Sequence, residues 1–470
     1  MAKETSARNV ALIIGGTGLA GGEIASTILN AEEKWSRVIL LSRSTVPKNV
    51  FGDNLSVDFT PIEGVSLSDQ SSILKALEKV SYGITHVFWF VDASHVHSTF
   101  FPTVARFFIH YAALVSGSVH PILPNFIRNE IITFAGVAAG SGSSKTNILW
   151  LQNLFEALRA VNAPLERFVL GTGAKHYGMH LGPTLWPSFK LPFRENMKCP
   201  GKLSYFDMED YIASRAEKEN FGYNIIRPGF ILGRPPRLRK NMQNIGVTLA
   251  VYCTILKARG QGLIFPGSYQ VYHTAQHLTT SKQIARIAVW ASTGGKRTHN
   301  EAYNSVSTVP FLWKKAWEDI AAYFGMEVIA PQPGNIVGVP CSYALGRRED
   351  CSDLWNQLVA QYGLKNHPFE EVFNELFLDK SFSFPWSSVF SVQKLKDHGF
   401  EEVHEASNAS ILFSEFFDLL VNQKIIPSPK TARTFPVVKC IQTKDSRRHQ
   451  FFPLLFALFS LLWFSFYILS

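Results

Sequence analysis

Lys175 stands directly after an apolar run, RFVLGTG at residues 167–173. Such a run is typical of a buried parallel strand, so the sequence predicts that Lys175 emerges at the carboxyl end of a sheet. Open α/β sheets bind their ligands at that end. A tyrosine one helical turn before the lysine would form a Tyr-x-x-x-Lys acid–base pair, and no such pair surrounds Lys175.

A tyrosine that could meet this lysine occurs later, in the stretch LSYFDMED. Tyr205 precedes Asp207, Glu209 and Asp210, and acidic residues are favoured in the first turn of a helix. A helix that begins here places Tyr205 at its entrance, near the strand ends, so Tyr205 and Lys175 are expected to meet in space as a catalytic pair. The alternative is that Tyr205 only opens a helix and that Lys175 is solvated.

The chain opens with an apolar strand, a glycine turn and a helix, in NVALIIGGTGLAGGEIASTIL. In this Gly-x-x-Gly-x-x-Gly pattern the first glycine permits a tight turn, the second lets the backbone approach a pyrophosphate, and the third lets the helix pack on the strand. The helix N-terminus also attracts phosphate charge. Gly15, Gly18, Leu19 and Gly21 are therefore predicted to bind a dinucleotide cofactor.

The next apolar strand, RVILLSRST, ends in Ser42, Arg43 and Ser44 and lacks the acidic residue that accepts hydrogen bonds from the ribose of NAD. A guanidinium group flanked by hydroxyls suits a 2′-phosphate in both charge and geometry. These three residues therefore favour NADPH as the cofactor, and an exposed loop arginine is the alternative interpretation.

Strands and helices alternate through the first half of the chain. Further strands are expected at 57–64, 85–91, 167–173 and 223–233, and a helix at 145–160. The apolar residues Ile148, Leu151, Leu154, Phe155 and Leu158 mark one face of that helix. This alternation predicts an α/β fold with a Rossmann-type doubly wound parallel sheet, followed by a smaller, mostly helical substrate-capping region.

Several motifs together resemble the progesterone 5-beta-reductase and iridoid synthase-like enone reductases, a divergent group of extended short-chain dehydrogenases. They are GGTGLAG, SRST, THVFW, TGAKHYG followed by Gly182-Pro183, SYFDMED, RPGFILG and NEAYN at 300–304. The resemblance covers about residues 9–427, apart from one insertion. It implies that Lys175 and Tyr205 are catalytic, because they match the lysine and the tyrosine of the family's two catalytic motifs.

The resemblance implies an NADPH-dependent reductase that adds hydride to the activated C=C bond of an enone or enal. A tyrosine hydroxyl stabilises the enolate only as its charge develops. Lys175 is expected to shift the tyrosine toward phenolate and to hold the nicotinamide ribose. His176 and Tyr177 are expected to line the pocket or to pack. The alternatives are a dehydrogenase or ketoreductase that acts on a carbonyl, and a non-catalytic NADP-binding protein.

The sequence departs from the family pattern where the substrate would lie. LSYF replaces the family's NFYY, and Phe230 follows RPG where the family has asparagine. Each change alters a wall of the pocket, so we expect a small apolar substrate, steroid- or terpenoid-like in kind, whose identity the family does not fix.

Charge and residue spacing argue against two other kinds of partner. The formal net charge of +9 is modest for 470 residues, and the Lys and Arg residues are scattered, so no nucleic-acid partner is expected. No Cys/His or carboxylate spacing suggests a metal site, so none is expected.

The chain divides into four predicted parts. A Rossmann domain at 9–234 holds an atypical insertion at about 101–143, which is either a membrane-facing or substrate-capping excursion or retained intron sequence. A capping region at 235–427 and a polar linker at 428–450 follow. The uncharged stretch 451–469 is long enough to span a bilayer and follows basic residues, which predicts a tail anchor in the endoplasmic reticulum membrane with the catalytic domain in the cytosol.

Overall fold

The structure is a computed structural model. It describes residues 9–430, except for 32, 47–49, 53, 81–82, 94–143, 240–243, 308, 336–337 and 402–407. The predicted insertion at 101–143 and the predicted anchor at 451–469 lie outside this part of the chain. Within it, no helix is both long enough and apolar enough to cross a membrane.

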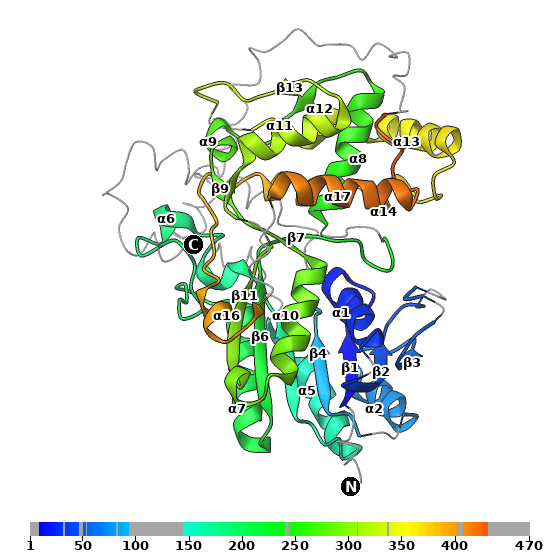
Figure 1. Cartoon of the computed structure of the whole chain (residues 1–470), viewed down its shortest axis with the longest axis vertical. Coiled ribbons are helices and arrows are strands. Elements are labelled where there is room, and N and C mark those ends of the chain that lie inside the picture. The colour runs from blue at the N-terminus through cyan, green and yellow to red at the C-terminus, as the bar shows by residue number, and fades with distance from the viewer. Residues whose placement is uncertain are drawn as a thin grey trace, which may run out of the picture. The chain divides into compact units, whose positions relative to one another are not determined.

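A seven-stranded parallel sheet organises the first half of the chain, in the order β11-β6-β5-β4-β1-β2-β3 (Figure 1). Its strands are β1 (Asn9–Ile14), β2 (Trp35–Leu41), β3 (Asp58–Ile62), β4 (His86–Trp89), β5 (Arg167–Gly171), β6 (Gly222–Pro228) and β11 (Glu301–Ser305). The predicted Rossmann-type α/β fold is confirmed. Its strand order reverses between β1 and β4, which is where such sheets bind dinucleotides.

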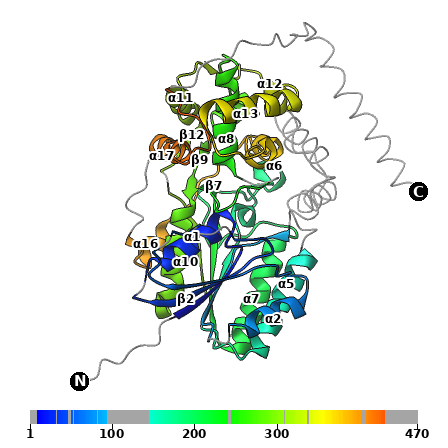
Figure 2. The same cartoon turned by 90° about the vertical axis from the view of Figure 1, so that its right-hand side faces the viewer.

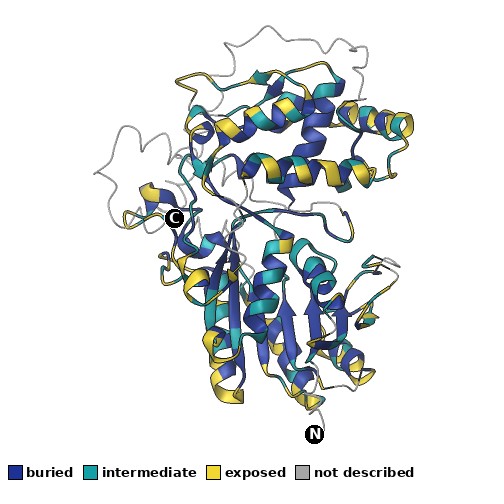
Figure 3. Cartoon of the chain, in the orientation of Figure 1, coloured by how far each residue is buried: buried dark blue, intermediate teal, exposed yellow. Residues whose placement is uncertain are grey.

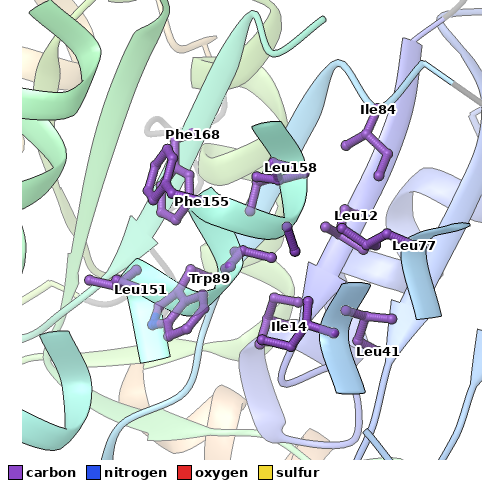
Figure 4. Packing of buried hydrophobic residues seen from close by; sticks show 14 of the residues in the cluster. Leu12, Ile14, Leu41, Leu77, Ile84, Trp89, Leu151, Phe155, Leu158 and Phe168 are labelled. Carbon is purple, nitrogen blue, oxygen red and sulfur yellow. The ribbon is translucent and has the colours of Figure 1, made fainter. Parts of the chain in front are cut away.

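Helices cover both faces of this sheet (Figure 2). On one face lie α1 (Leu19–Leu29) and α10 (Ser281–Thr293), and on the other lie α2 (Gln70–Glu78), α5 (Ser144–Ala160) and α7 (Ser204–Glu219). Successive residues of a strand point to opposite faces. Ala11 and Ile13 accordingly pack under α1 and α10, whereas Leu12 and Ile14 pack under α2 and α5 (Figure 4). The apolar stripe predicted for 145–160 is the face that α5 buries.

Most of the chain beyond β7 (Phe230–Leu232) forms a second, mostly helical lobe around α8 (Ile245–Ala258). This helix is buried almost all round, as its dark colour in Figure 3 shows. Its neighbours include α11 (Trp313–Phe324), α13 (Arg348–Tyr362), α15 (Glu375–Ser381) and α17 (Ala409–Asn422). The chain also returns to the sheet beyond the predicted boundary at residue 234, because α10 and β11 belong to the sheet layers.

The remaining elements are short. They are η3 (Ala174–Tyr177), α6 (Gly182–Leu185), β8 (Leu263–Ile264), α9 (Tyr269–Tyr272), β9 (Ala275–Gln276), β10 (Leu278–Thr280), η4 (Gly295–Thr298), β12 (Phe311–Leu312), β13 (Val328–Ile329), α12 (Cys341–Leu345), α14 (Phe369–Val372) and α16 (Gln393–Asp397).

Candidate active site

The glycine turn between β1 and α1 is a tight backbone loop. Gly15 has φ +89°, and a Cβ there would lie 2.5 Å from the carbonyl oxygen of Phe90. A Cβ on Gly21 would lie 2.4 Å from the carbonyl oxygen of Gly15, so this position also admits no side chain. The Gly18 amide donates to the same Gly15 oxygen at 2.9 Å, which closes the turn.

This turn fits a dinucleotide phosphate. Gly18 caps the N-terminus of α1 without any side-chain hydrogen bond, and the first turn, which begins at Leu19, holds no acidic residue. The amide groups of that turn are therefore left for an anion, which the helix dipole favours. The structure thus places Gly15, Gly18, Leu19 and Gly21 in one tight turn at the N-terminus of α1.

At the end of β2, Ser42 and Ser44 shape the loop that carries Arg43. The Ser42 hydroxyl donates to the Ser44 carbonyl oxygen at 2.6 Å, and the Ser44 amide points back at that hydroxyl at 3.2 Å. Arg43 is exposed beside them. Both serines thus act mainly on the loop backbone, and the guanidinium group of Arg43 remains the charged group of this site.

Two further arginines, which the sequence analysis missed, lie near Arg43. Partial desolvation, and then the charges of Arg43 and Arg237, lower the pKa of Arg239. The loop that carries Arg237 and Arg239 crosses the start of α1, because Pro236 lies 2.5 Å from where a Gly22 Cβ would be. The signal was the basic run RPPRLR directly after β7.

Lys175 and Tyr205 both lie at the carboxyl end of β5. Lys175 lies in η3, directly after that strand, and α7 begins at Ser204, so Tyr205 stands in its first turn as expected. The Tyr205 hydroxyl lies 3.7 Å from the position of a Cβ on Gly173. Both side chains are half-buried, and the charge of Asp92 acts on both.

The electrostatics keep the Tyr205 phenol neutral. Burial, followed by the negative charges of Asp92 and Glu209, raises the pKa of Tyr205 above its ordinary value of 10.0. The expected shift of this tyrosine toward phenolate is therefore not found, because burial and the two carboxylates all raise its pKa. Burial also lowers the pKa of Lys175, and Asp92 opposes that change. A neutral tyrosine can donate a hydrogen bond to a developing oxyanion.

Asp92, also missed from the sequence, is held in place at the end of β4. The Asn147 side-chain amide donates to an Asp92 carboxylate oxygen at 2.8 Å, and the Ala93 backbone amide donates to the Asn147 side-chain oxygen at 2.8 Å. Asn147 is fully buried in α5. The available signal was an acidic residue just past the predicted strand THVFWFV, at the ligand-binding edge of the sheet.

Glu209 is the centre of a buried polar network close to Lys175 and Tyr205. Its carboxylate accepts hydrogen bonds from Arg227 at 2.7 and 3.3 Å and from the Thr172 hydroxyl at 3.1 Å. His176 Nδ1 lies 3.2 Å away. Burial alone would raise the pKa of Glu209, but the contacts with His176 and Arg227 outweigh it and lower the pKa to about 2. Glu209 thus anchors the segment that carries Lys175, a role its helix-start position did not reveal.

The same network reaches the last strand of the sheet. Arg227 donates to the Tyr177 hydroxyl at 3.2 Å, and that hydroxyl donates to the Asn304 side-chain oxygen at 2.6 Å. The Asn304 amide donates to the carbonyl oxygens of Phe193 and Ser391, each at 3.0 Å. Tyr177 is fully buried, so it packs beneath the site and does not face a ligand.

Within the described residues, no group of three His, Cys, Asp or Glu side chains could hold a metal ion. The arrangement that remains is a dinucleotide-type turn beside a neutral tyrosine, a lysine and a carboxylate. It can stabilise an oxyanion next to a bound dinucleotide.

Comparison with known proteins gives the same picture. Residues 134–427 match the family described as the PRISE-like Rossmann-fold domain, and this match begins inside the 101–143 segment. Over 372 residues the chain is 25% identical to the 3-oxo-Delta(4,5)-steroid 5-beta-reductase of Arabidopsis thaliana. This alignment covers 78% of this chain and 81% of the relative. The predicted resemblance is confirmed.

Two further similarities agree with the sequence and the fold. The chain is 25% identical over 384 residues to an (S)-8-oxocitronellyl enol synthase of Camptotheca acuminata, covering 79% of this chain and 82% of the relative. Among solved structures, a UDP-N-acetylglucosamine 4-epimerase from Methanobrevibacter ruminantium M1 aligns with a TM-score of 0.51 at 15% identity, covering 88% of this chain and 99% of that one. This second likeness concerns the fold alone.

Proposed function

Because the chain belongs to the family of PRISE-like Rossmann-fold domains, we propose that it is an NADPH-dependent reductase of an activated C=C bond. Its substrate would be a small apolar enone or enal, steroid- or terpenoid-like in kind, as the names of the plant relatives suggest. The observation that carries the proposal is the neutral Tyr205 hydroxyl at the carboxyl end of β5, the strand after which Lys175 stands.

The reduced nicotinamide, when bound, supplies the hydride that adds to the β-carbon of the enone. Negative charge then gathers on the carbonyl oxygen of the substrate. Tyr205 donates a hydrogen bond to that oxygen and stabilises the charge as it forms. Lys175 would hold the nicotinamide ribose, and its positive charge favours the enolate. Asp92 and Glu209 keep the tyrosine protonated, which preserves the donor.

The preference for the phosphorylated cofactor rests on charge at the end of β2. No acidic residue follows that strand, and Arg43 shares its surroundings with Arg237 and Arg239. Three guanidinium groups suit a 2′-phosphate dianion, whereas the ribose hydroxyls of NAD gain little from them.

A panel of small enones and enals with NADPH tests the reaction. Formation of the saturated ketone or aldehyde is expected. An allylic alcohol as the product would instead identify a carbonyl reductase on the same fold. Binding of NADPH without its oxidation across the panel would indicate a non-catalytic NADP-binding protein.

We further propose a linker at 428–450 and a membrane anchor at 451–469. The anchor would hold the catalytic domain on the cytosolic face of the endoplasmic reticulum. The stretch 451–469 has no charge, and Lys444, Arg447 and Arg448 precede it. Carbonate extraction of membranes tests the anchor, with Leu461→Asp as the disabled variant. Release of the unaltered chain into the soluble fraction would contradict it.

A further inference from the structure

A cavity of about 440 Å³ opens at the amino end of the parallel sheet, the end opposite Tyr205. Lys34 stands directly before β2, and Thr298 lies in η4, shortly before β11, so both belong to the end where the strands begin. The cavity has the volume of pockets that hold small ligands. Among the described residues, its lining side chains are basic, aromatic or hydroxyl-bearing and include no carboxylate. They are Lys34, Trp290, Thr293, Arg297, Thr298 and His398.

Buried contacts hold the walls of this cavity in place. The fully buried Tyr303 of β11 packs edge-on against the Trp290 ring, with 5.3 Å between ring centroids, and its hydroxyl lies 2.8 Å from His398 Nδ1. The Thr298 hydroxyl donates to the Ala291 carbonyl oxygen at 2.7 Å, which joins η4 to the end of α10. The cavity is therefore part of the packed fold.

Lys34 and Arg297 bring two positive charges to the cavity. Both residues are exposed, and neither forms an ion pair within the described part of the chain. The Arg297 guanidinium group donates a hydrogen bond to the His398 carbonyl oxygen at 3.4 Å. The carboxylate of Glu301, shortly after η4, is paired with Lys394. Within the described residues the two charges therefore meet no carboxylate in the cavity.

The end of α10 accounts for part of this positive charge but not for all of it. A helix C-terminus carries roughly half a negative unit charge, which attracts basic groups. That is less than the two charges of Lys34 and Arg297. The carbonyl oxygens at this end also have other partners, because the Ser292 oxygen lies 3.3 Å from His86 Nε2 and the Ala291 oxygen accepts the bond described above. The two basic side chains are therefore available to an anion.

We propose that this cavity binds a small, soluble phosphate monoester, with the phosphate held by Lys34 and Arg297. The planar guanidinium group can donate two parallel hydrogen bonds to phosphate oxygens. The phosphate of a monoester carries close to two negative charges at pH 7, which match the two cations. The cavity is larger than a phosphate group, so the rest of the ligand has room beside the half-buried Trp290 ring. The cofactor turn lies at the other end of the sheet, so this ligand and NADPH bind independently.

Calorimetric titration with phenyl phosphate tests this site. Excess NADP⁺ keeps the glycine turn between β1 and α1 occupied, so that the probe does not bind there. Phenyl phosphate is expected to bind, whereas phenol, which has the same ring without the charge, should not. Arg297→Met and Lys34→Met should each weaken the binding by about tenfold or more, the range of one charge-assisted hydrogen bond.

Lys296→Met is the matched control, because Lys296 is the exposed neighbour of Arg297 in η4 and does not line the cavity. It should bind phenyl phosphate as tightly as the unaltered chain. Thermal unfolding gives a second readout, since phenyl phosphate should raise the unfolding temperature of the unaltered chain and of Lys296→Met, and that of Arg297→Met much less. Without the ligand, all three variants should unfold near the unaltered temperature, because the replaced side chains are exposed.

Five results would overturn the inference. Absence of phenyl phosphate binding would show that the basic side chains serve only the end of α10. Equal binding of phenol would show that the cavity does not recognise charge. Undiminished binding in both Arg297→Met and Lys34→Met would place the anion elsewhere, and an equal loss in Lys296→Met would indicate a diffuse basic surface. Binding to vesicles of phosphatidic acid and phosphatidylcholine, in place of phenyl phosphate, would assign the cavity to a lipid headgroup.

Discussion

Tyr205 and Lys175 reach the candidate active site from different elements, α7 and η3. Burial and neighbouring charges shift the pKa of the two side chains in opposite directions. Burial and two carboxylates keep the tyrosine protonated, whereas burial weakens the proton affinity of the lysine. In the proposed reaction the tyrosine would therefore act as a hydrogen-bond donor and not as a base. This assignment of roles is what substitutions of single residues can test.

Replacing Tyr205 with phenylalanine removes the donor and keeps the ring. Turnover of simple enones should fall by roughly 10² to 10³, because the developing enolate loses one hydrogen bond. NADPH affinity should change little. Single-turnover NADPH oxidation measures the chemical step. Tyr211→Phe, on the same helix and also half-buried, is the control and should react at the unaltered rate. An unchanged rate in Tyr205→Phe would make the tyrosine structural.

Replacing Arg43 with glutamate places a negative charge where the 2′-phosphate is expected. NADPH binding should weaken by roughly 10- to 100-fold, and NADH binding should change far less, because only NADPH carries the extra phosphate. Fluorescence titration with both cofactors measures the two affinities. Lys218→Glu, exposed on α7, makes the same change in charge away from the site. Equal losses for NADPH and NADH would remove Arg43 from the cofactor site.

At the scale of elements, the Glu209–Arg227 pair fixes α7 on β6. Glu209→Ala leaves the Arg227 guanidinium group buried without its main partner, so the free energy of unfolding should fall by about 3 to 5 kcal/mol. Asp210→Ala is the control, since Asp210 is exposed and lies 3.8 Å from Lys198 in a surface pair worth about 0 to 1 kcal/mol. Urea unfolding compares the two variants. Similar small losses in both would mean that the buried pair contributes little.

The sequence predicted elements better than contacts. Continuous apolar runs located β1 and β5, which are buried on both faces of the sheet, an apolar stripe located α5, and acidic residues marked the start of α7. None of these patterns revealed that Glu209 pairs with Arg227 or that the charge of Asp92 acts on Tyr205. These partners lie far apart in the chain, and only packing brings them together. A pattern within a short stretch of sequence does not show which distant residues come into contact.

At the scale of the whole molecule, neutral histidines are buried in both lobes and at their junction. His86 lies in β4, between the Thr85 hydroxyl at 2.9 Å and the Ser292 carbonyl oxygen at 3.3 Å. His277 accepts a hydrogen bond from the Phe390 amide at 3.0 Å, and His180 is buried in the segment that follows Lys175. Burial is the first cause that lowers the pKa of each of these three histidines.

These histidines should make the fold acid-sensitive below pH 6.5. In the folded chain the pKa is about 4 for His86 and His277 and about 3 for His180. The ordinary pKa of a histidine is 6.5. When the pKa of a histidine is lower in the folded chain than in the unfolded chain, this difference stabilises the fold at a pH above the unfolded pKa. The stabilisation is lost as the pH falls from the unfolded pKa toward the folded pKa. Between the two pKa values of each histidine, the unfolded chain binds a proton that the folded chain does not. The free energy of unfolding therefore falls by about 1.4 kcal/mol per histidine for each pH unit. Glu209, with a pKa of about 2 against an ordinary 4.5, extends the loss to lower pH.

Urea unfolding between pH 7.5 and 4.5 measures this dependence. Stability should fall steeply below pH 6, and His86→Gln should make the slope shallower by about 1.4 kcal/mol per pH unit, because its amide can still donate to the Ser292 carbonyl and does not titrate. A stability that is flat from pH 7 to 5 would mean that the buried histidines gain protons without opening the fold.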